Sequence, residues 1–226
     1  MAHPQPVLPN FHNFHESWLS TQQSFLQQLL DSAALQSNDK EDAQLRLIAQ
    51  VLAHYQQYYD ELSKAAAEDI FQVLSAPWLT SFERTFLWIS GFKPSLLIRL
   101  LFAAVNDLTP AQSARLNEVR AEVKWKEREL TDAMASLQET IAAPPMLELA
   151  RRVGAGRLVD GEICEMENAI EELKMGMLRV ADRADLLRGS TVMTVVEILN
   201  SDQMVRVLVA VVGFQLRIRR WGLQRD

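Results

Sequence analysis

The chain has 226 residues and a formal net charge of −6. Hydrophobic residues make up 48% and charged residues 23% of it, a composition typical of one folded domain, which excludes disorder of the whole chain. The negative net charge gives no overall attraction to nucleic acid or to anionic lipid, so binding of either would need a local basic segment.

The ends of the chain and its cysteine content predict a protein of the nucleus, the cytoplasm or both. The first Lys or Arg is Lys40, so a secretory signal and an organelle transit peptide are not expected. Cys164 is the one cysteine, which suits a reducing compartment. The longest apolar run, Val207 to Phe214, is far shorter than the roughly 20 residues that span a bilayer, so no membrane contact is expected.

Apolar residues recur at steps of three and four along most of the chain, the spacing of one helix face. Residues 1–9 carry three prolines and no periodicity, which predicts a disordered lead-in before a single domain over residues 10–226. No convincing strand pattern is found. The fold class is therefore predicted as all-α, a bundle of long packed helices with a short aromatic-rich central helix. The helices are expected near residues 10–36, 39–75, 80–91, 96–105, 110–142, 163–187, 191–200 and 202–221, with a short segment at 146–152 and a flexible loop near 153–161.

Residues with special backbone or capping roles set several of these boundaries. Thr80 with Glu83, and Thr109 with Gln112, have the spacing of capping boxes, in which two side chains satisfy free N–H groups at a helix start. Gly91 stands where a helix end favours a left-handed residue. Gly189 with Ser190 is expected to interrupt or bend the long helix that contains them.

No recognisable pattern of catalytic residues occurs, so the sequence predicts no enzyme, no catalytic residue, no cofactor and no metal site. All four histidines precede residue 55, and Cys164 has no second cysteine to share a metal with. His12, His15 and Glu16 have the spacing of a weak metal site, although exposed polar residues at a helix start are the commoner explanation.

Two residue groups allow a functional and a structural interpretation. Tyr55, Tyr58, Tyr59 and Trp78 have the spacing either of an apolar ligand pocket or of aromatic packing between helices, and we favour packing. The C-terminal helix carries Arg217, Arg219, Arg220 and Arg225 on an apolar background. These arginines are candidate contacts for a partner or a phosphate, and the helix also has features of a calmodulin target or a membrane-surface helix. Its two apolar stripes favour a terminal helix that packs on the rest of the domain and leaves its arginines exposed to solvent.

The segment from Ala76 to Ser95, APWLTSFERTFLWISGFKPS, resembles the signature of the plant Delay of Germination domain, which is shared with the C-terminal half of TGA-type bZIP factors. Supporting segments are Phe14 to Trp18, Ala53 to Tyr55, Leu137 to Glu139, Ala184 to Arg188 and the ending Arg220 to Asp226. The resemblance is greatest to the stand-alone Delay of Germination-like proteins, because no basic region accompanies the domain. The motif residues are Trp78, Phe82, Glu83, Arg84, Phe86, Trp88, Gly91 and Pro94.

The resemblance implies a plant regulatory protein that acts by binding proteins, in transcription-linked control of seed maturation, dormancy or hormone and stress responses. A bZIP factor or a protein phosphatase is the kind of partner expected, whereas direct DNA binding is not implied without a basic region. Calmodulin, expected from the basic and apolar C-terminal helix, and a second copy of the chain are further candidate partners. A histidine pair linked to haem in the seed-dormancy member is replaced here by Gln215 and Arg219, so haem binding by that pair is not carried over. The alternatives are a sensor of an apolar small ligand and a direct sequence-specific DNA-binding regulator.

Overall fold

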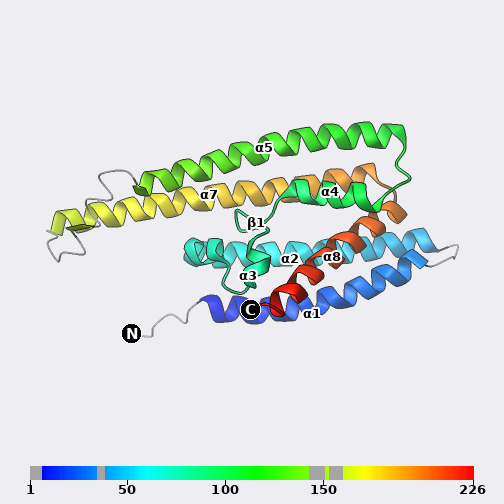
Figure 1. The fold of residues 1–226 in the computed structure, drawn as a ribbon, viewed down its shortest axis with the longest axis horizontal. Coiled ribbons are helices and arrows are strands. Elements are labelled where there is room, and N and C mark those ends of the chain that lie inside the picture. The colour runs from blue at the N-terminus through cyan, green and yellow to red at the C-terminus, as the bar shows by residue number, and fades with distance from the viewer. Residues whose placement is uncertain (1–6, 35–38, 143–150, 153–159) are drawn as a thin grey trace.

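The structure is a computed structural model that describes residues 7–34, 39–142, 151–152 and 160–226. It confirms the all-α fold class: within those ranges lie seven helices and one short hairpin of two strands (Figure 1). In chain order the elements are α1 (Val7–Ala34), α2 (Lys40–Ser75), α3 (Ser81–Arg84), β1 (Leu87–Trp88), β2 (Gly91–Phe92), α4 (Pro94–Ala104), α5 (Pro110–Ala142), α7 (Asp160–Ile198) and α8 (Ser201–Leu223).

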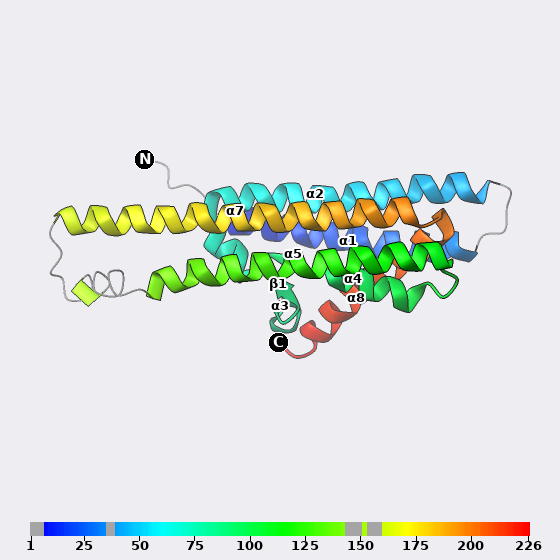
Figure 2. The ribbon, with the colours of Figure 1, turned by 90° about the horizontal axis from the view of Figure 1, so that it is seen from above.

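The long helices form two antiparallel pairs. α1 packs along α2, and α5 packs along α7, while contacts between α2 and α7 join the two pairs. α8 crosses obliquely and contacts α1, α2, α3 and α4 (Figure 1). From above, α5 and α7 extend past α2 at one end of the molecule (Figure 2). The short elements α3 and β1 lie to one side of the two pairs, close to the C-terminus (Figure 2).

The core divides into two apolar clusters, which explains why most helices carry more than one buried stripe. One cluster contains Trp78, Trp88 and Ile98 with the inner faces of α5 and α7. The other contains Leu29 and Val205 with the neighbouring faces of α2, α4 and α8. Both α2 and α4 contribute to both clusters. The signature segment, which connects α2 to α4, is therefore held at both of its ends.

Both predicted capping boxes are present. The backbone N–H of Thr80 donates to Glu83 Oε2 at 2.8 Å, and the N–H of Glu83 donates to Thr80 Oγ1 at 3.2 Å. At the start of α5, the N–H of Thr109 donates to Gln112 Oε1 at 3.0 Å, and the N–H of Gln112 donates to Thr109 Oγ1 at 3.2 Å. Side-chain capping thus begins α3 and α5 where the sequence predicts it.

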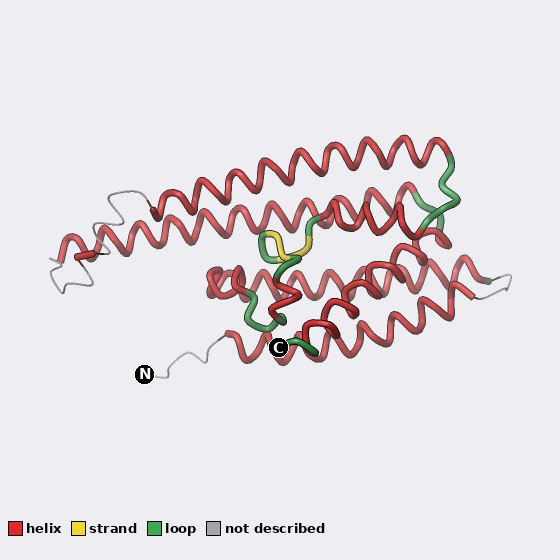
Figure 3. Tube along the Cα trace, viewed as in Figure 1, coloured by secondary structure: helices red, strands yellow, loops and turns green. Residues whose placement is uncertain are grey.

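The short central helix is much shorter than expected, and a hairpin follows it. α3 ends at Arg84, and the chain then forms β1 and β2, which pair antiparallel (Figure 3). Within the hairpin, positive φ occurs at Ile89 (44°) and Ser90 (60°). Gly91 does not have a positive φ in the left-handed region, so the expectation of a left-handed Gly91 was wrong. Two adjacent residues of positive φ make the primed turn whose twist matches a two-residue hairpin.

Three helices also differ from the prediction. α1 begins at Val7, before the expected start at Asn10. α7 runs through Gly189 without interruption, because residues 160–198 form one continuous helix. α2 is kinked at Asp69 (φ −148°, ψ 91°), whose carboxylate accepts from the N–H of Gln72 at 3.1 Å and so restarts the helix. Most of the predicted segment 146–152 and of the loop 153–161 lies outside the described residues.

No helix in the described part of the chain combines the length and the apolar character that crossing a membrane requires.

Candidate functional site

The signature motif forms the connection between α2 and α4, and most of it is inside the protein. Trp78, Glu83, Trp88, Gly91 and Pro94 are buried, Phe82 and Phe86 are half-buried, and Arg84 is exposed. The motif therefore mainly supports the fold, and it reaches the surface at α3.

Glu83 is a buried carboxylate whose Oε2 has three hydrogen-bond donors. Besides the N–H of Thr80, it accepts from the Thr80 hydroxyl at 2.7 Å and from Arg219 Nη1 at 3.2 Å. Arg219 also pairs with Glu16 of α1. The arginine thus links α8 to the signature helix and to α1, and it serves an internal contact instead of the partner surface for which the sequence made it a candidate.

Arg188 of α7 holds the hairpin turn. Its guanidinium donates to the carbonyls of Trp88 at 2.6 Å, Ile89 at 2.7 Å and Phe92 at 2.9 Å, and it also pairs with Asp185. The positive φ of Ile89 and Ser90 is unfavourable for residues that carry a side chain, so the hydrogen bonds from Arg188 stabilise a turn that would otherwise be costly.

Arg188 also explains why position 91 is a glycine. A Cβ at Gly91 would lie 2.9 Å from the Cζ and Nε atoms of Arg188, closer than such atoms approach. The guanidinium cannot withdraw easily, because three carbonyls hold it. Glycine is thus required here for close approach and not for a left-handed backbone.

Two contacts from α5 complete the support of the segment. Glu127 is buried, and its carboxylate accepts from the N–H of Ser95 at 2.7 Å, which satisfies a free donor in the first turn of α4. The indole N–H of Trp88 donates to Thr131 Oγ1 at 2.9 Å.

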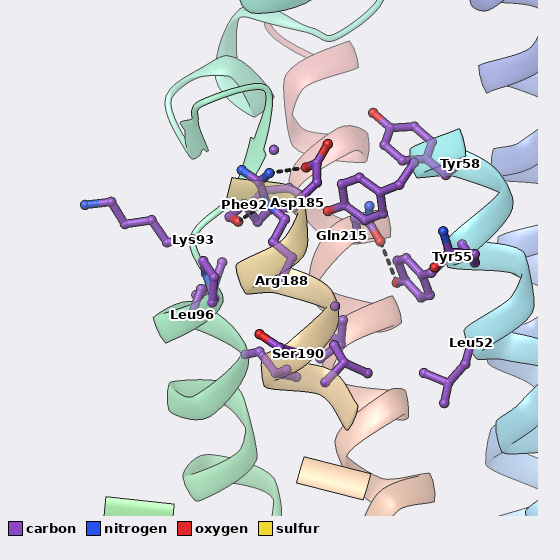
Figure 4. A pocket seen from close by; sticks show the side chains of 18 of the residues that line it. Leu52, Tyr55, Tyr58, Phe92, Lys93, Leu96, Asp185, Arg188, Ser190 and Gln215 are labelled. Atoms are coloured by element: carbon purple, nitrogen blue, oxygen red, sulfur yellow. Dashed lines mark hydrogen bonds and ion pairs between the residues drawn. The ribbon is translucent and has the colours of Figure 1, made fainter. Parts of the chain in front are cut away.

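A partly open cavity of about 770 Å³ lies beside the signature hairpin, lined mainly by residues of α2, α4, α7 and α8 (Figure 4). Tyr55, Tyr58 and Tyr59 all line it, whereas Trp78 does not and instead packs on Phe11 with ring centroids 4.5 Å apart. Burial raises the pKa of all three tyrosines, so their hydroxyls stay protonated at neutral pH. The structure thus combines both interpretations of these aromatic residues, because the tyrosines line a cavity and Trp78 belongs to the core.

A polar network lies at the α1 side of this cavity. The hydroxyl of Tyr55 donates to Gln215 Oε1 at 2.8 Å (Figure 4). The amide Nε2 of Gln22 donates to the same oxygen at 3.2 Å. His15 lies nearby, buried among Trp18 and Tyr58, and it also lines the cavity. Burial is the main reason that the pKa of His15 is lowered to about 3, with smaller contributions from the charges of Arg219 and His12. His15 is therefore a neutral imidazole at pH 7.

The predicted metal alternative at the start of α1 is not assembled. His15 is buried, His12 is exposed, and Glu16 pairs with Arg219. In residues 7–34, 39–142, 151–152 and 160–226, no three His, Cys, Asp or Glu side chains come together in a way that would hold a metal ion.

The end of α8 forms a mixed basic and aromatic surface, which we call the C-terminal patch. Its residues are all exposed: Arg217, Arg220, Trp221, Leu223 and Arg225. It is continuous with the signature, because the Phe82 ring contacts Trp221 (centroids 6.3 Å apart) and lies 5.8 Å from the Arg225 guanidinium carbon. Three of the four predicted arginines therefore remain available to a partner.

Arg188, Glu127 and Gln22 were not identified by the sequence analysis as site residues. Arg188 occurs in the segment Ala184 to Arg188 that contributes to the family resemblance, so that segment was the one available signal. Glu127 and Gln22 act through partners 32 and 193 residues away in the chain, which periodicity alone does not reveal.

Comparison with known proteins gives matches along nearly the whole chain. A family model described as seed dormancy control (DOG1) matches residues 26–103. Protein ZW2 of Arabidopsis thaliana is 40% identical over 219 residues, covering 94% of this chain and 96% of its own length. Protein RESPONSE TO ABA AND SALT 1 of the same plant is 38% identical, covering 93% of this chain and 94% of its own length.

Two further relatives match less closely. Protein DOG1-like 4 of Arabidopsis thaliana is 33% identical, covering 97% of this chain and 94% of its own length. Transcription factor TGA5 is 31% identical over 79% of this chain but 54% of its own length, so the similarity is to part of that factor. The resemblance seen in the motif residues is confirmed: the chain belongs to the Delay of Germination (DOG1) family of plant proteins.

Proposed function

We propose that this protein is a non-enzymatic regulator that recruits other proteins through the C-terminal patch, in transcription-linked control of seed dormancy or of hormone and stress responses. The observation that carries the proposal is the exposure of Trp221, 54% accessible, among three exposed arginines. Trp and Arg are enriched among the residues that dominate protein interfaces. The proposed places of action are the nucleus and the cytoplasm.

The patch favours an acidic partner surface with an apolar centre. Arg217 and Trp221 are four residues apart on one face of α8, so a partner that covers the indole also meets the guanidinium groups. Arg219 contributes little charge to this surface, because Glu83 and Glu16 neutralise it.

The partner that we favour is a TGA-type bZIP factor. Such factors contain a region similar to this chain, so two related helical domains are available to associate, and the factor would supply the contact with DNA. A protein phosphatase, calmodulin and a second copy of this chain are the other partners to be tested.

The test is capture of a purified TGA-type bZIP factor on the immobilised chain. The triple variant Arg217→Ala, Arg220→Ala, Arg225→Ala should weaken capture by roughly tenfold or more, since three partly desolvated charge contacts are lost. A charge-matched control carries Arg46→Ala, Arg99→Ala and Arg128→Ala, which are also exposed but lie on α2, α4 and α5. Equal capture by both triple variants would remove the patch from the proposal, and no capture by the unmodified chain would remove the bZIP factor.

A second candidate function, a sensor of an apolar small molecule, is favoured by the cavity between α2, α4, α7 and α8. Its volume of about 770 Å³ is within the range of small-molecule sites, roughly 300–1,000 Å³.

A further inference from the structure

The wall of the cavity beside the signature hairpin is mostly hydrocarbon. Leu52, Leu96, Leu100, Met204, Leu208 and Phe214 are among the side chains that line it. Such a wall offers water few hydrogen bonds, whereas a buried water needs two to four polar partners. The space therefore suits an apolar occupant better than solvent.

An unused polar atom marks one end of the cavity. His15 is 3% exposed and lines the cavity, and its Nδ1 has no hydrogen-bond partner among the described residues. Gln22 is fully buried next to Tyr55 and does not line the cavity, so its Oε1, although also unpartnered in that part of the chain, is not a contact for a ligand. A buried polar atom left unpaired costs about 1–3 kcal/mol, so a ligand group that bonds to it would gain that energy back.

The type of unused atom favours a hydroxyl group on the ligand. Nδ1 of the neutral His15 imidazole is either a donor or an acceptor according to its tautomer. A hydroxyl donates and accepts, so it matches either tautomer, whereas a carboxylate only accepts.

The charges around the cavity argue against an anionic ligand. The cationic lining residues are Lys93 and Arg188, but Arg188 is already bound by Asp185 and three carbonyls, and Lys93 is exposed over the Trp88 ring. Four carboxylates lie on the same lining, and two of them, Glu83 and Asp185, are neutralised by Arg219 and Arg188, which leaves the negative charges of Asp60 and Asp182. An added carboxylate would find no free buried cation among the described residues and would be repelled.

We propose that this cavity binds a neutral, mostly hydrocarbon molecule that carries a hydroxyl group, with the hydroxyl at His15 and the hydrocarbon between α4, α7 and α8. The proposal specifies the ligand class for the sensor alternative, and it is independent of recruitment by the C-terminal patch.

The test uses Nile red, a neutral fluorescent dye, with 1-dodecanol and dodecanoate as competitors of equal chain length at pH 8. Saturable dye binding at one site per chain is expected, and dodecanol should displace the dye at a concentration about tenfold lower than dodecanoate, because one lost hydrogen bond and the local negative charge cost about 1.4 kcal/mol. Absence of saturable binding, or equal displacement by both competitors, would overturn the proposal.

Two variants on α8 locate the site. Val211 lines the cavity, whereas Val209 does not, and both are half-buried. Val211→Phe should weaken dye binding about tenfold by filling space, and Val209→Phe should leave it unchanged. Equal loss in both variants, with each shown to be folded by circular dichroism, would exclude this cavity as the binding site. Neither variant alters the C-terminal patch, so capture of a bZIP factor reports on recruitment separately.

Discussion

The guanidinium of Arg219, in the last helix, lies 3.2 Å from the carboxylate of Glu83, in the signature helix. The two side chains are 12% and 6% exposed, so this ion pair is largely removed from water. Of the two adjacent signature residues, Glu83 therefore lies inside the protein and Arg84 at the surface. The ion pair between Glu83 and Arg219 holds α8 against α3.

Replacing Arg219 should destabilise the fold. Arg219→Ala leaves Glu83 buried without its charge partner, which we expect to lower the free energy of unfolding by about 3 kcal/mol. Arg217→Ala, two residues earlier and exposed, should change it by less than about 0.5 kcal/mol. Urea unfolding followed by circular dichroism measures both. Equal stability of the two variants would show that the pair contributes nothing.

Replacing Arg188, which holds the hairpin, should lower the free energy of unfolding about as much as replacing Arg219. Arg188→Gln removes the bonds to three carbonyls and the partner of Asp185, so we expect a loss of about 3 kcal/mol in the same measurement. Arg183→Gln, on the same helix, breaks only an exposed pair with Glu129 and should cost less than about 1 kcal/mol. A loss of the same size in Arg183→Gln would contradict the role assigned to Arg188.

Two glycines in helices should respond in opposite directions to alanine. A Cβ at Gly222 would lie 2.0 Å from Thr80 Oγ1, which the capping box holds in place, so Gly222→Ala should cost about 2 kcal/mol. At Gly189 a Cβ would meet nothing within 4 Å, so Gly189→Ala should stabilise α7 by about 0.5–1 kcal/mol. The difference in midpoint of thermal unfolding checks the pair, and a stabilising Gly222→Ala would show that α8 does not pack on α3 this closely.

Stability should fall between pH 7.5 and 5.5 because of His15. The pKa of this buried imidazole is lowered from 6.5 to about 3, so the unfolded chain takes up a proton in this range and the folded chain does not. The expected loss at pH 5.5 is about 1.4 kcal/mol, corresponding to one pH unit below the unfolded pKa. Burial lowers the pKa of His54 too, which adds to the same trend.

The variant His15→Gln isolates this contribution. It should reduce the loss of stability between pH 7.5 and 5.5 by about the same 1.4 kcal/mol, since the unfolded chain then has one titrating group fewer. His12→Gln, at an exposed neighbouring position, is the control and should leave the pH dependence unchanged. If both variants kept the full dependence, His15 would not be the group responsible.

The sequence predicted the elements that depend on local chemistry. The capping boxes at Thr80 and Thr109 mark helix starts because the partner side chain is three residues away, and apolar spacing revealed the long helices. The hairpin was missed because its turn uses Ile89 and Ser90, which have no preference for positive φ and depend on Arg188 from a distant helix. Periodicity likewise gave no reason to single out Glu127, because its role depends on Ser95 in another helix.

The candidate site shows the same division. The tyrosines and the C-terminal arginines were found because their residue types are unusual at that spacing. The pairing of Arg219 with Glu83 could not be predicted, since the two residues are 136 positions apart and only the crossing of α8 over α3 brings them together. The cavity also depends on how four helices cross, which no local pattern encodes.

The most direct test of recruitment as the function is binding to duplex DNA over a range of salt concentrations, with the chain alone and with a TGA-type bZIP factor. Contacts with phosphate weaken steeply as salt rises, so the salt dependence identifies direct binding. The account predicts no sequence-selective binding by the chain alone and formation of a joint complex with the factor on DNA. Tight, sequence-selective and salt-dependent binding by the chain alone would contradict it, and would make Arg217, Arg220 and Arg225 the first candidates for the phosphate contacts.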